Sequence, residues 1–305
     1  IIIENNIKEL DKLIDIITKP EYDVIYKQSI LSDKTCKIYR EDDKNNAIDF
    51  KEYMEDFFNV EFYRNYFRLI DEKDNMKGVI TGLSYFEVGI EANKLKLPFV
   101  NLALSSQDLF YDFAMLKHAI DDLGTSKNID QVIIGLSNYS FRYDLSMTQN
   151  LQTKGKPKVY YPILKNLHNY LNKSEVIYKY NMFEKEFNNL FQENYLFKIF
   201  EYEQNRFNIS WNDMLKGKFD SRNLSEEEKQ REIYLAQRWN QNYPDTIEEN
   251  TRIFREMLNY LKDKNIKVIV VTSPATDFYK NYFPQNCRQE LMDIIRKFEE
   301  EFEFT

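Results

Sequence analysis

The sequence is poor in glycine and histidine, and each shortage excludes a kind of site. Its 305 residues include only 7 Gly and 2 His, so a metal site built from several histidines is nearly excluded. Neither the phosphate-binding P-loop pattern nor the G-x-G-x-x-G fingerprint of dinucleotide-binding proteins occurs. Three of the seven glycines, Gly78, Gly82 and Gly89, share one short stretch. We therefore expect unusual backbone geometry or a close approach of chain segments in that stretch.

Cysteine, excess basic charge and long apolar runs are also missing. Cys36 and Cys287 lie far apart, with no Cys or His at ligand spacing, so we expect buried free thiols rather than disulfides or a zinc site. The net charge of −8 gives no reason to expect nucleic acid binding, which needs a basic surface. No apolar run approaches the roughly 18–20 residues of a membrane span.

The first residues, IIIENNIKEL, lack both a Met and the basic region of a signal peptide. We expect the sequence to be a piece of a longer product. Its compartment, cytoplasmic or associated with the cell envelope, stays open, and so does its oligomeric state.

The composition that remains is globular, with 43% hydrophobic and 30% charged residues of both signs. Four compact apolar segments, 78–83, 99–104, 131–136 and 266–274, have the length of strands, and each is reached through a helical pattern. Continuous apolar strands joined by helices are typical of a parallel sheet that helices cover on both faces. The sequence therefore predicts a three-layer α/β/α fold.

One helix, at 107–123, is predicted in detail. We expect Ser105 or Ser106 as its N-cap and Gly124 at its end. Its buried stripe is predicted to be Leu109, Phe113, Leu116 and Ile120.

The rest of the chain is divided by pattern. We expect residues 1–75 to be an N-terminal helical segment packing on the core, and 76–305 to be the α/β domain with a helical insertion at about 142–245. The aromatic residues of 176–243, including Trp211 and Trp239, are expected to pack between helices; the alternative is a carbohydrate-stacking surface. A second capping signal opens the helical stretch that begins NLSEEEKQ.

Asn250 lies on the apolar stripe of the helical stretch 246–264. A buried amide at such a place needs hydrogen-bond partners, so we expect a structural role for it.

Polar residues follow three of the predicted strands. Ser84 follows the first, Ser106 the second and Asn138 the third. Ligand sites of parallel α/β sheets form beyond the carboxyl ends of the strands, so these three side chains are expected to face one crevice if their strands are neighbours. A serine beside N–H and amide donors suits acyl transfer, in which the serine attacks and the donors hold the oxyanion.

Plainer interpretations exist for the same residues. Ser84 is also a good N-cap for a helix that follows a strand, and Asn138 is also a common turn residue. The nucleophile elbow of α/β-hydrolases is G-x-S-x-G, and Phe86 stands here in place of its second glycine. That fold is therefore not expected.

The three strand-end stretches together resemble the SGNH (GDSL-like) hydrolase superfamily. Gly82-Leu83-Ser84 is similar to its first block, and NLALSSQD is similar to its second, with Ser106 in the place of the oxyanion-hole Gly. IIGLSNYSF is similar to the third block, with Asn138 at the oxyanion-hole Asn, and IKVIVVTSP resembles the last core strand. The resemblance covers about 76–142 and 245–275, and is closest to bacterial members that modify cell-surface polysaccharides or teichoic acids.

The resemblance implies a serine esterase or O-acyltransferase acting on acetyl-type esters of a cell-surface glycan. Ser84 would be the nucleophile, and the Ser106 backbone and Asn138 would form the oxyanion hole, with no cofactor. The implied partner is a carbohydrate or acylated glycan. The alternative is an inactive SGNH-like scaffold that binds glycan or protein. A flavodoxin-like nucleotide binder ranks last, because no phosphate-cradling glycine loop is present.

The sequence departs from the family in one serious way. The family's Asp-x-x-His block, which supplies the base, does not occur in the 305 residues. His118, within the amphipathic helix, and His168, in the predicted insertion, are expected to be structural rather than catalytic. Asp277 follows the fourth strand and is expected to be an ordinary loop carboxylate. The base is therefore expected in a downstream Asp-x-x-His, or the protein has lost it.

Overall fold

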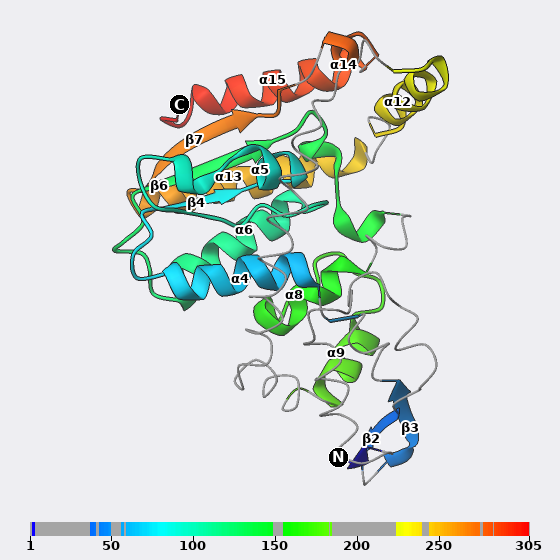
Figure 1. The fold of residues 1–305 in the computed structure, drawn as a ribbon. Helices are drawn as coiled ribbons and strands as arrows, with labels where there is room; N and C mark the ends of the chain where they lie inside the picture. The colour runs from blue at the N-terminus through cyan, green and yellow to red at the C-terminus, as the bar shows by residue number, and fades with distance from the viewer. Residues whose placement is uncertain are drawn as a thin grey trace. The chain divides into compact units, whose positions relative to one another are not determined.

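The computed structural model divides into two compact units (Figure 1). Unit 1 is Ile1–Arg64 with Gly155–Lys218, and unit 2 is Asn65–Lys154 with Phe219–Thr305. The structure describes residues 2–3, 37–40, 43–49, 56–57, 59–148, 155–182, 184, 224–239, 244–274, 277–282 and 284–304. Among these residues, no helix combines the length and the apolar character that crossing a membrane requires.

Unit 2 is built on a parallel sheet. Its strands are β4 (Gly78–Thr81), β5 (Phe99–Asn101), β6 (Gln131–Leu136) and β7 (Lys267–Thr272), and their order across the sheet is β5-β4-β6-β7. All four predicted strands are confirmed, and every pair is parallel.

The strand order creates a reversal in the middle of the sheet. The chain moves from β4 outward to β5, then returns past β4 to β6 and continues to β7. In open α/β sheets, such a switch point opens a crevice at the carboxyl ends of the two strands on either side of it. Here those strands are β4 and β6, whose Ile80 and Ile133 are paired. Beyond β7, Phe304 makes a single parallel bridge to Val268.

Helices follow the strands in alternation. Those in unit 2 are α5 (Ser84–Gly89), α6 (Leu109–Lys117), α12 (Glu226–Trp239), α13 (Ile247–Asp263), α14 (Asp277–Tyr282) and α15 (Gln285–Glu299). Short turns of helix are η1 (Ala92–Lys94), η2 (His118–Asp122), η3 (Ser140–Arg142), η4 (Leu145–Met147) and η6 (Pro244–Thr246). The helix α4 (Val60–Glu72) begins in unit 1 and ends in unit 2.

The two faces of the sheet are covered by different helices. Side chains alternate along each strand, so Val132 and Ile134 of β6 pack into a large core with α6, α13 and α15. Ile133 points to the other face, where a smaller core forms with Ile80 and with Phe86 of α5. The sheet thus lies between two helical layers, and the predicted three-layer α/β/α fold is confirmed.

The details predicted for the helix after β5 hold, with one correction. Every residue of the predicted stripe is buried, namely Leu109, Phe113, Leu116 and Ile120. Gly124 has φ +70° and follows the end of η2, as a helix-ending glycine does. The N-cap, however, is neither Ser105 nor Ser106. Asp108 caps the helix because its carboxylate accepts the Tyr111 N–H, while Ser106 stands in a turn ahead of the helix.

Two further polar predictions are confirmed. The Asn250 amide donates to the backbone oxygens of Phe141 and Tyr143, each at 3.0 Å, so it anchors the segment after β6 to α13. At α12, the Ser225 hydroxyl accepts the Glu228 N–H and the Glu228 carboxylate accepts the Ser225 N–H. This reciprocal pair is a capping box.

Unit 1 combines a small antiparallel sheet with helices. Its strands are β1 (Ile2–Ile3), β2 (Lys37–Arg40) and β3 (Asp43–Asp49), and its helices are α8 (Lys156–Leu164) and α9 (Lys173–Met182). Lys37–Arg40 and Asp43–Asp49 therefore form strands within the segment 1–75, which was expected to be helical. The alternation I-Y and N-A-I-D there is short, and no apolar run marks it as a sheet.

Aromatic side chains of unit 1 pack edge to face. The ring centroids of Phe62 and Tyr160 lie 4.8 Å apart, and those of Phe57 and Tyr180 lie 5.4 Å apart. For Tyr180 this matches the expected packing role. Trp211 and the side chain of Trp239 lie outside the described residues.

Candidate functional site

The three candidate residues follow three adjacent strands at the same edge of the sheet. Ser84 comes after β4, Ser106 after β5 and Asn138 after β6, and the order β5-β4-β6 puts the Ser84 turn in the middle. We call this group, Ser84, Ser106 and Asn138, the strand-end site. It stands at the carboxyl edge, and the β4/β6 switch point is part of it. The condition stated for a shared crevice, that the strands be neighbours, is met.

Ser84 is the first residue of α5, not its N-cap. The cap position belongs to Leu83, which makes no side-chain cap hydrogen bond. Gly82, two residues before Ser84, has φ +133°, a conformation that side chains rarely allow. A Cβ on Gly82 would lie 2.7 Å from the Phe86 ring and 2.8 Å from the Gly135 oxygen. The chain therefore turns sharply between strand and helix, and glycine is what makes the turn fit.

The other two glycines of that stretch behave differently from each other. A Cβ on Gly78 would lie 2.2 Å from the Phe99 ring, so a close approach explains this glycine as well. A Cβ on Gly89 would meet nothing within 4 Å, and its φ is ordinary. The expectation of special geometry is thus confirmed at Gly78 and Gly82 and wrong at Gly89.

Ser106 lies in a turn with left-handed backbone. Its φ is +61°, and the turn is closed by the Gln107 N–H, which donates to the Leu104 oxygen at 3.0 Å. Left-handed backbone is uncommon for a non-glycine residue, and such strain gathers at functional sites. Ser106 therefore has the kind of backbone that glycine would adopt more easily, at the position where the resemblance places a glycine.

Asn138 is a central residue of a tight turn. The Ser140 N–H donates to the Ser137 oxygen at 3.1 Å, and the Ser137 N–H donates to the Ser140 hydroxyl at 2.9 Å. These bonds close the turn around Asn138 and Tyr139, and Asn138 is half-buried. Asn138 thus occupies both the turn position of the plainer interpretation and the strand end at the switch point.

The short helix α5 is tied to the strand ends on both sides of it. Toward β5, the Glu87 carboxylate accepts the Ser105 N–H at 2.9 Å, and the Asn101 amide donates to the Phe86 oxygen at 2.9 Å. Toward β6, the hydroxyls of Tyr85 and Tyr139 share a hydrogen bond. The turn that carries Ser84 is therefore fixed to the two turns that carry Ser106 and Asn138.

The tyrosine pair sets the electrostatic character of this edge. Burial raises the pKa of Tyr139 well above its ordinary value, and the neighbouring Tyr85 raises it further. Burial also raises the pKa of Tyr85, although the hydrogen bond from Tyr139 works in the other direction. Both hydroxyls consequently stay protonated at neutral pH, so they act as hydrogen-bond donors and not as bases.

Asp112 is a further residue of this edge, and the strand-end pattern of the sequence does not predict it. Its side chain is buried, and its Oδ1 accepts the Gly82 N–H at 2.8 Å and the Gln107 amide at 2.6 Å. Burial raises the pKa of Asp112 to about 7, and Asp108 adds to the rise, while the bonds from Gln107 and Gly82 oppose it. A signal was available, because Asp112 is a carboxylate three residues after Leu109 on an otherwise apolar helix side.

His118, the histidine of unit 2 among the described residues, does not join the strand-end site. His118 is 9% exposed, and its Nδ1 lies 2.8 Å from an Asp122 carboxylate oxygen. It lies at the end of α6 and η2, where Lys264, just before β7, donates to Asp121. That is the amino edge of the sheet, so the structural interpretation of His118 is supported. His168 belongs to unit 1. In the described part of unit 2, the carboxyl edge therefore has no histidine.

Asp277 is the first residue of α14, five residues after the end of β7. It follows a strand on the carboxyl edge, as expected, but its side chain lies outside the described residues. Arg142, after β6, donates two hydrogen bonds of 2.8 Å to the Glu290 carboxylate, and this pair joins η3 to α15.

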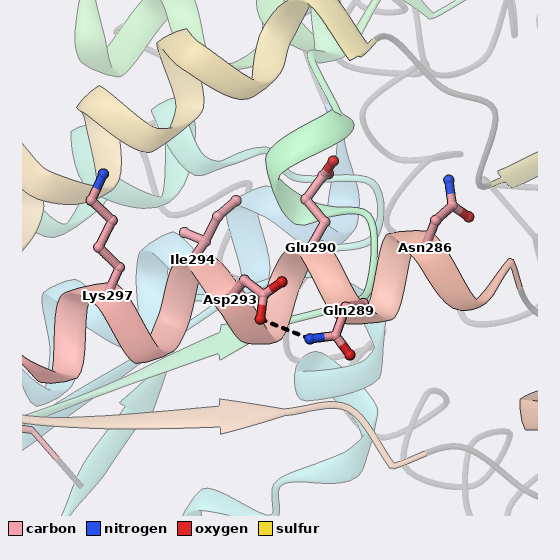
Figure 2. Close-up of a pocket in the computed structure, with 6 residues that line it drawn as sticks. All are labelled: Asn286, Gln289, Glu290, Asp293, Ile294 and Lys297. Carbon is pink, nitrogen blue, oxygen red and sulfur yellow. Dashed lines mark hydrogen bonds between the residues drawn. The ribbon is translucent and has the colours of Figure 1, made fainter.

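A pocket of about 440 Å³ lies elsewhere, along α15 (Figure 2). Its described lining is Asn286, Gln289, Glu290, Asp293, Ile294 and Lys297. All six residues come from one helix, and Gln289 is engaged with the Asp293 carboxylate at 2.7 Å. Binding sites usually gather polar groups from several elements. The strand-end site, which draws on three strand ends, is therefore the better candidate for chemistry.

Comparison with known proteins finds no relative of this chain. No protein-family model, no curated protein and no solved structure matches the chain.

Proposed function

We propose that the strand-end site performs acyl transfer through Ser84, on acyl esters of a glycan. The observation that carries the proposal is that three turns follow adjacent strands at one edge of the sheet, each with a group that this chemistry uses. Ser84 offers a hydroxyl at a sharp strand-to-helix turn. Ser106 offers an N–H on a strained turn, and Asn138 offers an amide.

The proposed reaction has two halves. In the first, the Ser84 Oγ attacks the ester carbonyl and its proton goes to a base; the C–O bond to the alcohol then breaks, and the base gives that proton to the departing alcohol oxygen, which leaves an acyl-serine. The Ser106 N–H and the Asn138 amide hold the negative oxygen that forms during attack. In the second, water or a sugar hydroxyl attacks the acyl-serine and restores Ser84. Water as acceptor makes the protein an esterase, and a sugar hydroxyl makes it an O-acyltransferase.

The proposal needs a base, because a serine hydroxyl at its ordinary pKa is a poor nucleophile. The tyrosines nearest to Ser84 are held protonated by burial, and His118 lies at the other edge of the sheet. The resemblance assigns this role to an Asp-x-x-His that the 305 residues do not contain. The base is therefore the one part of the proposed reaction that the described residues do not supply.

Fluorophosphonate labelling tests the nucleophile directly. The probe forms a P–O bond with an activated serine and releases fluoride. The protein is expected to label once, and Ser84→Ala is expected to lose about 99% of the label, since the loss of a catalytic group costs roughly a hundredfold or more. Ser105→Ala is the matched control on the same sheet edge and is expected to label normally. Equal labelling of Ser84→Ala and the parent protein would remove Ser84 from the proposal.

A second candidate function is a non-catalytic scaffold that binds glycan or a partner protein. The absence of a histidine from the carboxyl edge within the described part of unit 2 favours it. Isothermal titration with acetylated and deacetylated oligosaccharides separates the two. A scaffold binds without consuming the ester, and it binds equally well after Ser84→Ala. Release of acetate that depends on Ser84 excludes the scaffold.

A further inference from the structure

Asp112 lies where two turns of the strand-end site meet. It belongs to α6, yet its carboxylate contacts neither solvent nor a cation among the described residues. Its two hydrogen bonds come from Gly82, two residues before Ser84, and from Gln107, one residue after Ser106. Burying a carboxyl on an otherwise apolar helix face costs free energy unless hydrogen bonds satisfy its oxygens.

The contacts around Asp112 hold both turns firmly. The Gly82 N–H donates to Asp112, and the Gly82 oxygen accepts the Leu104 N–H at 3.0 Å, so both backbone groups of this glycine are engaged. The Gln107 amide also donates to the Leu102 oxygen at 3.2 Å, and this bond secures the side chain to the end of β5. A single carboxylate oxygen thus joins the turn after β4 to the turn after β5.

We propose that Asp112 is a positioning residue that fixes the Gly82 turn against the Gln107 turn, so that the Ser84 hydroxyl and the Ser106 N–H face the same acyl group. This inference rests on the proposed function for its catalytic consequence. The joining of the two turns stands independently, on the two hydrogen bonds. Asp112 itself does not touch the substrate and acts through Gly82 and Gln107.

The charge of Asp112 adds a pH dependence to this arrangement. An ionised carboxylate is the stronger hydrogen-bond acceptor, so the joint between the turns tightens as Asp112 loses its proton near pH 7. The charged group that faces it is Asp108, on the loop leading into the same helix, while Gly82 and Gln107 contribute only uncharged donors. Labelling of Ser84 is therefore expected to rise across neutral pH through Asp112 as well as through the base.

Two variants separate position from charge. Asp112→Asn keeps an oxygen that accepts both bonds but does not titrate. Asp112→Leu keeps the approximate size and removes the acceptor, which leaves the buried Gly82 N–H unpaired. Asp71→Asn, an exposed aspartate on α4, is the matched control.

The test uses two measurements on the full-length protein. Amide hydrogen exchange at Gly82, followed by NMR, is expected to be roughly tenfold or more faster in Asp112→Leu and nearly unchanged in Asp112→Asn and Asp71→Asn. The rate of fluorophosphonate labelling is expected to fall at least tenfold in Asp112→Leu. Asp112→Asn is expected to retain labelling but to lose one of the pH inflections near 7.

The outcomes are distinguishable. If Gly82 exchange in Asp112→Leu equals that of the parent protein, the joint between the turns does not exist and the inference is wrong. If exchange accelerates but no variant, the parent included, labels at Ser84, the proposed function fails while the structural joint stands, and the catalytic part of the inference falls with the function. If Asp112→Leu does not fold, Gln107→Leu, which removes one of the two donors to Asp112, takes its place in the labelling measurement, and a rate equal to that of the parent contradicts the inference.

Discussion

The turn after β4 and the turn after β5 both leave the common backbone regions, but only the first does so with a glycine. Gly82 has φ +133° and no room for a Cβ, whereas Ser106 has φ +61° and carries a full side chain. The strand-end site therefore contains two unusual backbone conformations. At Gly82 the glycine removes the strain, whereas at Ser106 the strain remains. Strain of about 1–2 kcal/mol at a non-glycine residue persists where surrounding contacts determine the conformation, and functional turns are a common place for it.

The largest expected effect comes from replacing Gly82, the glycine that allows the turn after β4. Gly82→Ala combines a φ that L-residues rarely adopt with contacts of 2.7 Å and 2.8 Å to the Phe86 ring and the Gly135 oxygen. Together these are expected to lower the free energy of unfolding by roughly 5 kcal/mol. Urea denaturation followed by circular dichroism measures the change.

The matched control for that variant is Gly89→Ala, at the end of the helix that the Gly82 turn leads into. Gly89 has open space around it, so alanine is expected to be neutral or to stabilise by up to about 1 kcal/mol. A similar loss from both variants would show that glycine in the stretch 82–89 matters for a reason other than the turn.

The second effect is a pH dependence of stability that comes from Asp112, the residue joining the two turns. Its folded pKa is raised to about 7 from 3.8, so the folded protein keeps a proton that the unfolded chain releases above pH 4. The stabilising contribution is complete below pH 4, falls as the pH rises toward 7, and is constant above that. Between pH 5 and pH 8, the parent protein is expected to lose about 3 kcal/mol relative to Asp112→Asn.

Urea denaturation of both proteins at several pH values checks this slope. The difference between the two free energies of unfolding should grow in one direction only. A difference that is flat with pH would mean that Asp112 is ionised throughout and that burial does not control its pKa.

A smaller effect concerns the third turn, which holds Ser84 from the β6 side. Tyr139→Phe removes the hydroxyl of a half-buried side chain that bonds to Tyr85, and it is expected to cost about 1–2 kcal/mol. Tyr85→Phe removes the partner that is 37% exposed, where water replaces the lost bond, and is expected to cost less than 1 kcal/mol. Thermal denaturation of the pair tests the order; a larger loss from Tyr85→Phe would contradict the burial argument.

The sequence predicted the sheet well because its strands are short, continuous apolar runs between helical patterns, and such runs are typical of buried parallel strands. It located Ser84, Ser106 and Asn138 at strand ends for the same reason. It did not find Asp112, because a carboxylate on a helix is ordinarily solvated, and only the tertiary fold brings Gly82 and Gln107 to it. It assigned the helix cap to Ser105 or Ser106 instead of Asp108, since several capping residues stand in a row and the left-handed turn at Ser106 is invisible in one dimension.

The strands β2 and β3 were missed for a related reason. Their four and seven residues are largely polar, so neither alternation nor an apolar run distinguishes Lys37–Arg40 and Asp43–Asp49 from loop or helix. Pairing between the strands holds them together, and pairing is a long-range property. Predictions from local pattern therefore succeed where a buried element has a clear apolar pattern. They fail where a strand is held only by backbone hydrogen bonds to its partner strand.

The smallest effect returns to the second turn and tests whether its strain serves the site. Ser106→Gly relieves φ +61° and keeps the N–H, so it is expected to change stability by less than about 1 kcal/mol and to leave labelling of Ser84 intact. Ser106→Pro removes the N–H and fixes φ near −65°, so labelling is expected to be lost. Ser106→Ala, which keeps the N–H and the strain but removes the hydroxyl, separates backbone from side chain. If both Ser106→Ala and Ser106→Gly lose labelling, the Ser106 hydroxyl is the group that the reaction requires, and the role assigned to the Ser106 N–H is wrong. If Ser106→Ala and Ser106→Gly both label normally, residue 106 acts through its backbone alone. The two turns then differ only in that the Ser106 position has room for a side chain and the Gly82 position does not.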